Sequence, residues 1–74
     1  MSTVKYEIRI VVNDEPDDDE ASESLGAAEV GAFEAYRSLR TRGLNEFVVE
    51  LYEVINDGED ERPLASYTEE GQQL

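Results

Sequence analysis

A net charge of −13 on 74 residues is the feature that most limits how this chain can fold. The charge arises from 19 Asp and Glu against 6 Lys and Arg, and eleven of the acids fall in two short segments, Asp14–Glu23 and Asp57–Glu61. Carboxylates at this density resist packing, so both segments are expected outside the core and residues 14–23 are expected to form a mobile loop. With 39% apolar residues, the rest of the chain suffices for one small domain with a thin core.

Three segments have the patterns of regular secondary structure. Residues 3–13 alternate between an apolar and a mixed face, which is typical of a half-buried strand. Residues 46–56 predict a second strand that is partly apolar on both faces, and residues 63–68 predict a third that begins with Pro63, as edge strands can. The tail, residues 69–74, is polar and expected to be frayed.

Between the first two strands, the pattern predicts a helix that is capped by Ser22 or Ser24 and ends at Gly43. Its sheet-facing stripe contains Leu25, Ala28, Ala32, Ala35, Tyr36 and Leu39, with Phe33 at the edge. The small residues of the stripe let the helix lie close to a sheet. Gly26 and Gly31 weaken the helix by about 1 kcal/mol each relative to Ala.

This order predicts a single α+β domain over residues 1–74, β-α-β-β, in which a three-stranded sheet has one helix packed on one face. A right-handed crossover would make the first two strands parallel, and the third would return antiparallel. Both acidic segments would then lie at one pole, while Arg37, Arg40 and Arg42 would lie at the other. The predicted core contains Ile8, Ile10, Leu39, Val49 and Leu51.

The residue types argue against catalysis. The chain has no His and no Cys, so its serines lack the usual general base and no thiol nucleophile exists. A catalytic carboxylate pair would need a cleft, for which a chain of 74 residues offers little room. We therefore expect no enzyme activity, no catalytic residue and no cofactor. Neither acidic segment matches an EF-hand, so no metal site is predicted, although a module that responds to divalent cations stays an alternative.

The segment MSTVKYEIRI lacks the basic and apolar regions of a signal peptide, and no apolar run approaches the roughly 18 residues of a membrane helix. A cytoplasmic protein is expected. A charge of −13 repels nucleic acid and anionic membranes and attracts basic protein surfaces. The expected partner is thus a basic protein surface, with no direct nucleic-acid or membrane contact. Adaptation to a salt-rich cytoplasm would also explain the acidity.

Three segments carry a resemblance in layout: the first strand YEIRIVV, the helix segment EAYRSLR, and the strand pair FVVELYEV and PLASYTEEG. Together with the acidity, this layout resembles small phage-encoded inhibitors, including anti-CRISPR and anti-restriction proteins that imitate the charge of DNA. The resemblance implies blockade of the basic groove of a nucleic-acid-handling protein, in the host cytoplasm if the chain is encoded by a phage. It transfers no functional residue, and the long acidic segment at 14–23 departs from the most compact members.

The candidate partner-binding residues are the acids of the two segments: Asp14, Glu15, Asp17, Asp18, Asp19, Glu20, Asp57, Glu59, Asp60 and Glu61. Each would steer the encounter and form charge-assisted contacts with Lys or Arg. In the alternative interpretation the acids serve solvation, and the chain acts as an interaction module on its open sheet face or as a homodimerisation module. Tyr52 is expected on that face beside Lys5, Glu7, Arg9 and Glu50, either as cross-strand packing or as an interface anchor.

Overall fold

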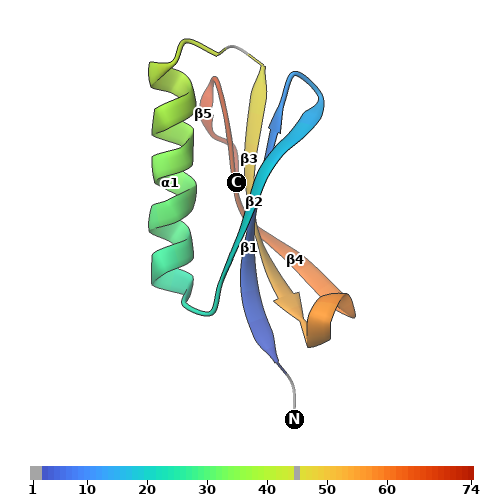
Figure 1. The fold of residues 1–74 in the computed structure, drawn as a ribbon. Helices are drawn as coiled ribbons and strands as arrows, with labels where there is room; N and C mark the ends of the chain where they lie inside the picture. The colour runs from blue at the N-terminus through green and yellow to red at the C-terminus, as the bar shows by residue number, and fades with distance from the viewer. Residues whose placement is uncertain (1–2, 45) are drawn as a thin grey trace.

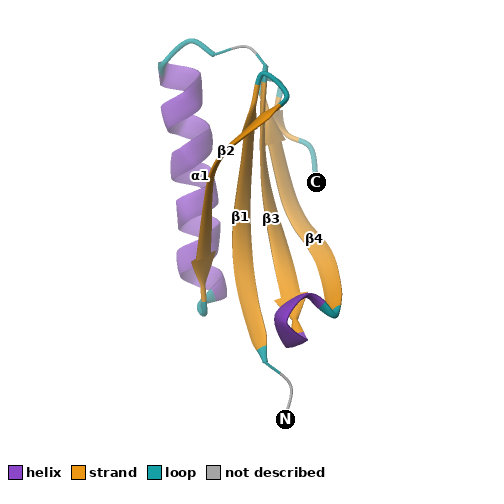
Figure 2. Cartoon of the chain, turned by 45° about the vertical axis from the view of Figure 1, so that its right-hand side comes forward, coloured by secondary structure: helices purple, strands orange, loops and turns teal. Residues whose placement is uncertain are grey.

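The computed structural model describes residues 3–44 and 46–74, which form one antiparallel sheet and one long helix (Figure 1). The elements follow in the order β1 (Val4–Val12), β2 (Glu15–Ser22), α1 (Leu25–Thr41), β3 (Phe47–Ile55), the 3-10 turn η1 (Asn56–Gly58), β4 (Asp60–Thr68) and β5 (Gly71–Gln72). The five strands lie in the order β2-β1-β3-β4-β5. Helix α1 covers one face of the sheet, and no α-helix of the described residues covers the other (Figure 2).

The α+β class and the single helix on one face agree with the sequence prediction, but the three-stranded sheet was wrong. The segment expected as an acidic loop is strand β2, which pairs antiparallel with β1 from Val12↔Glu15 to Tyr6↔Ser22. Asn13 and Asp14 have φ angles of 52° and 63°, the positive values that a tight two-residue hairpin turn requires. Backbone pairing directed by this turn overrides the poor strand propensity of Asp and Pro.

The extra strand reverses the predicted direction of the chain. Since β2 returns along β1, strand β3 runs antiparallel to β1, with Val4 opposite Ile55 and Val12 opposite Phe47. The parallel crossover expected between these two strands is therefore wrong. Strand β4 is longer than the predicted 63–68, and part of the tail expected to be frayed forms β5, which pairs with Tyr67 and Thr68.

Helix α1 agrees with its prediction at both ends. The side chain of Ser24 accepts a hydrogen bond from the backbone N–H of Ala27, which caps the first turn. The helix ends at Thr41, and Gly43 follows with a φ of 77°, a conformation that favours glycine. Of the predicted stripe, Ala28, Ala32, Tyr36 and Leu39 are buried, whereas Leu25 lies beyond the sheet contact and is exposed.

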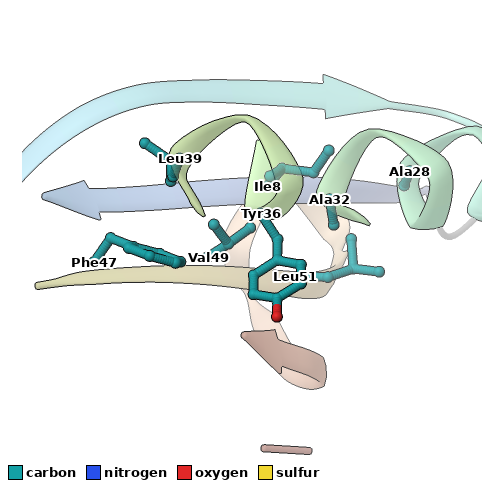
Figure 3. Packing of buried hydrophobic residues seen from close by; sticks show 8 residues of the cluster. All are labelled: Ile8, Ala28, Ala32, Tyr36, Leu39, Phe47, Val49 and Leu51. Carbon is teal, nitrogen blue, oxygen red and sulfur yellow. The ribbon is translucent and has the colours of Figure 1, made fainter. Parts of the chain in front are cut away.

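The core lies between α1 and the two central strands (Figure 3). Ile8 of β1 and Phe47, Val49 and Leu51 of β3 meet the buried side chains of the helix. Four of the five predicted core residues are buried, and Ile10 packs against the cluster while remaining partly exposed. The rings of Tyr36 and Tyr67 stack with centroids 5.1 Å apart, which extends the contact of the helix to β4.

Gly31 allows the close approach of α1 to β1. A Cβ atom at this position would lie 2.9 Å from Cδ1 of buried Ile8, whereas a Cβ at Gly26 would meet nothing closer than Ser24 Oγ at 3.9 Å.

We expect Gly26→Ala to raise the free energy of unfolding by about 0.5–1 kcal/mol through helix propensity. Gly31→Ala should gain less than Gly26→Ala, because the buried Cδ1 methyl of Ile8 must move to admit the new Cβ. Urea denaturation compares the two variants, and equal gains would show that Ile8 repacks freely.

Candidate partner-binding surfaces

Arg9 is at the centre of a polar network on the sheet face opposite α1. Its guanidinium donates hydrogen bonds to Glu7 and to Glu61, each at 2.8 Å, and lies 4.3 Å from the ring centroid of Tyr52. Lys5 adds a contact of 3.6 Å to Glu7. The strand register places these groups together, because Glu7 is opposite Tyr52 and Glu61 is opposite Val54. The prediction that Tyr52 lies beside these charged residues on the open face is confirmed.

The network changes the proton affinities of its members. The hydrogen bond from Arg9 lowers the pKa of the Glu7 carboxyl below its ordinary value, and the two carboxylates raise the pKa of Arg9. The Tyr52 hydroxyl donates to Glu50 at 2.9 Å, and this bond raises the pKa of Tyr52. Arg9, Glu7 and Glu61 are all partly shielded from solvent. This arrangement is cross-strand packing, and it already engages Glu61, one of the predicted partner-binding residues.

The first group of predicted partner-binding residues follows the edge of the sheet. Asp14 lies in the β1–β2 turn, and Glu15, Asp17, Asp19 and Glu20 lie along β2, where they are exposed. The side chain of Asp18 lies outside the described part of the structure. Among residues 3–44 and 46–74, strand β2 pairs only with β1, so no described strand covers its outer edge. We call residues 15–20 the acidic strand.

The second group lies at the opposite end of the sheet from Asp14. Asp57 belongs to η1, Glu59 follows it, and Asp60 and Glu61 begin β4. This turn adjoins the Val4 end of β1, because Ile55 pairs with Val4, whereas Asp14 follows the Val12 end. Nine residues of β1 separate the two ends, about 27 Å at the usual rise per residue. The single acidic pole predicted from the sequence is therefore wrong, since it depended on parallel strands.

A different set of acids gathers at the Val12 end. The β1–β2 turn, the start of β3 and the β4–β5 turn meet there, at the top of Figure 1. They surround a shallow hollow of about 550 Å³ whose lining includes Val11 and Val48 together with the carboxylates of Asp14, Glu46, Glu69 and Glu70. We call this feature the acidic hollow. In the described parts of the chain, none of these four carboxylates forms an ion pair.

Backbone hydrogen bonds fix the segments that carry these acids. The N–H of Asn13 donates to the carbonyl of Glu46 at 2.8 Å, which ties the β1–β2 turn to the start of β3. The N–H of Glu70 donates to Thr68 Oγ1, and the N–H of Gln73 donates to the carbonyl of Ser66. Sequence reasoning identified only Asp14 of this set. The Asn13–Asp14 pair was the signal for the hairpin that reverses the chain and brings the other three acids alongside.

The helix arginines lie near the same end but on the side of α1. Arg40 donates a hydrogen bond of 2.6 Å to the Tyr36 hydroxyl, and Arg37 and Arg40 border a second shallow hollow next to Phe33, whose side chain is 46% exposed. Their position near the helix C-terminus complements the helix dipole. Arg37, Arg40 and Arg42 form no ion pair within residues 3–44 and 46–74.

Within the part of the chain that the structure describes, His, Cys, Asp and Glu form no group of three or more that could hold a metal ion. Nor does the one long helix have the length and the apolar character that crossing a membrane requires.

Comparison with family models, with curated proteins and with solved structures found no match to this chain.

Proposed function

We propose that this protein binds a basic surface of a nucleic-acid-handling protein through the acidic strand and the adjoining Asp14. The observation that carries the proposal is the spacing of charge on β2. Five of the six residues from Glu15 to Glu20 are acidic. At a strand rise of about 3.4 Å per residue, they present roughly one negative charge per 4 Å. One strand of DNA carries about one per 3.4 Å of its axis.

A groove that binds a phosphate backbone has Lys and Arg side chains arranged along a line. The acidic strand offers such a groove a similar charge density along its axis, with carboxylates on both faces of an edge strand. Contacts between these carboxylates and the basic side chains would be charge-assisted hydrogen bonds. The protein would thereby occupy the groove and exclude nucleic acid, which makes it an inhibitor.

This proposal divides the predicted partner-binding residues into two groups. The acids from Asp14 to Glu20 form the proposed contact. Asp57, Glu59 and Asp60 lie at the far end and serve as a matched control, while Glu61 is held by Arg9. The control matters because every acid contributes to long-range attraction, whereas only acids in the contact form short-range bonds.

The test uses three forms of the protein as immobilised bait. The first is the wild type, the second is Asp17→Asn, Asp19→Asn, Glu20→Gln (the strand variant), and the third is Asp57→Asn, Glu59→Gln, Asp60→Asn (the turn variant). Both variants lose three charges at exposed positions. Lysate of the source cells is passed over each bait, and retained nucleic-acid-binding proteins are challenged with duplex DNA.

We expect the wild type and the turn variant to retain a protein that duplex DNA displaces, and the strand variant to retain at least tenfold less. With the purified partner, the affinity should fall as salt rises, and the strand variant should show the shallower salt dependence. Equal retention by the strand and turn variants would contradict the proposal.

The competing interpretation, acidity as salt adaptation, has one observation in its favour. The acids lie on β2, on both ends of the sheet and on the outside of α1 at Glu29 and Glu34, rather than on one surface. Salt adaptation predicts that neither variant loses a partner. The bait experiment therefore separates the two interpretations by the strand variant alone.

A further inference from the structure

The acidic hollow combines an apolar floor with a rim of carboxylates, and we propose that it receives a Lys or Arg side chain of the partner. This inference rests on the proposed function, because it names an anchor point beside the acidic strand. Val11 and Val48 are half-buried and contribute to the floor, and Asp14, Glu46, Glu69 and Glu70 contribute to the rim. Its volume of about 550 Å³ lies within the range of ligand-binding pockets.

The two parts of the hollow match the two parts of a long cationic side chain. Lys and Arg bury their methylene stems along apolar surface and keep the charged head in a polar environment. The valines suit the stem, and the carboxylates suit the head. Four carboxylates repel any anionic ligand, and a purely apolar ligand would remove water from these carboxylates without compensation. Charge and polarity together thus select a cation with an aliphatic stem.

The cations of the chain itself are placed elsewhere. Arg9 binds Glu7 and Glu61, Lys5 binds Glu7, and Arg62 binds Glu53 at 3.1 Å. The three helix arginines do not contribute to the lining of the hollow. Backbone hydrogen bonds hold the turns that carry these acids, so a guest cation meets a backbone that is already in place, and only the exposed side chains have to adjust. Asp14 joins the hollow to the acidic strand, so one partner can cover both surfaces.

The test uses n-butylammonium chloride and methylammonium chloride as probes of the purified full chain. Both carry one positive charge, but only the first has the aliphatic stem of lysine. Binding is followed by NMR through the methyl signals of Val11 and Val48, at low salt and constant ionic strength. We expect saturable shifts of these methyl signals, with n-butylammonium binding at least fivefold tighter than methylammonium, because burial of its additional methylenes is favourable.

Three variants sharpen the result. The rim variant carries Glu46→Gln, Glu69→Gln and Glu70→Gln, and its affinity for n-butylammonium should be at least tenfold lower than that of the wild type. The turn variant loses the same number of charges at the far end, and its affinity for n-butylammonium should change less than twofold. Val48→Thr keeps the shape of the side chain but makes the floor polar, and it should reduce the preference for n-butylammonium over methylammonium.

Equal affinity for the two probes, or equal weakening by the rim and turn variants, would overturn the inference by showing that cations only gather in a diffuse atmosphere. These outcomes are independent of the bait experiment. If the strand variant loses its partner while the probes do not discriminate, the proposed function stands and the hollow is not its anchor. If the probes discriminate but the strand variant retains its partner, the hollow stands as a cation site and the function assigned to the acidic strand falls.

Discussion

Leu51→Ala should lower the free energy of unfolding by about 3 kcal/mol, most of the stability available to a domain of this size. Leu51 is 1% exposed at the centre of β3, where it contacts the cluster between the sheet and α1. Its loss would leave a cavity that the neighbouring strands cannot readily fill, because β1 is paired on both sides and β4 is paired with β3 along its length.

Leu25→Ala is the matched control for this prediction. It removes the same atoms from a side chain that is 40% exposed at the start of α1, so we expect a loss below about 0.5 kcal/mol. Urea denaturation at neutral pH measures both variants. A loss below about 1 kcal/mol for Leu51→Ala would mean that β3 does not occupy the centre of the core.

The second large effect concerns salt. Between about 10 mM and 1 M NaCl, the screening length falls from roughly 30 Å to roughly 3 Å. The molecule measures 43 × 23 × 19 Å, so at low salt the screening length is comparable to its size. The acids, which outnumber the basic residues by 13, then repel one another across most of the fold. We expect the melting temperature to rise by roughly 10 °C across this range, equivalent to about 1–2 kcal/mol. Screening also weakens the Arg9 pairs, but exposed pairs of this kind contribute less than about 1 kcal/mol.

Thermal melts of the wild type and the turn variant test this expectation. With three charges fewer, the turn variant should melt higher than the wild type at 10 mM NaCl and gain less from added salt. A melting temperature that does not change with salt would show that the acids are far enough apart, or sufficiently solvated, for their repulsion to be negligible in the folded state.

The sequence predicted those parts of the fold that depend on hydrophobic periodicity. Alternation over residues 3–13 and 46–56 identified β1 and β3, and the 3.6-residue period together with Ser24 and Gly43 identified α1. Strand β2 could not be found in this way, because EPDDDEAS has no apolar face to alternate with a polar one. Its strand conformation is imposed by the preceding turn and by pairing with β1, neither of which leaves a periodic pattern.

That one missed strand accounts for most of the errors at the candidate site. Without β2, the direction of every later strand is reversed relative to β1, and the acids of residues 57–61 appear to join those of residues 14–23. With β2 in place, Glu46, Glu69 and Glu70 join Asp14 instead. The shared open face of Lys5, Glu7, Arg9, Glu50 and Tyr52 was predictable, because side-chain alternation along β1 and β3 is the same in either direction. The ion pair of Arg9 with Glu61 was not, because Glu61 was expected beside the acids of residues 14–23.

The open outer edge of β2 has a consequence for the molecule in concentrated solution. A free strand edge is a template on which a second chain can pair, and edge-to-edge growth of this kind leads to fibres. In two copies of β2 the facing side chains would be carboxylates on both faces of the new ladder, so pairing between copies is opposed by their charge. The same acids that would attract a basic partner thus keep identical molecules apart. This protection depends on the charge of the edge, so high salt, which screens the carboxylates, should weaken it.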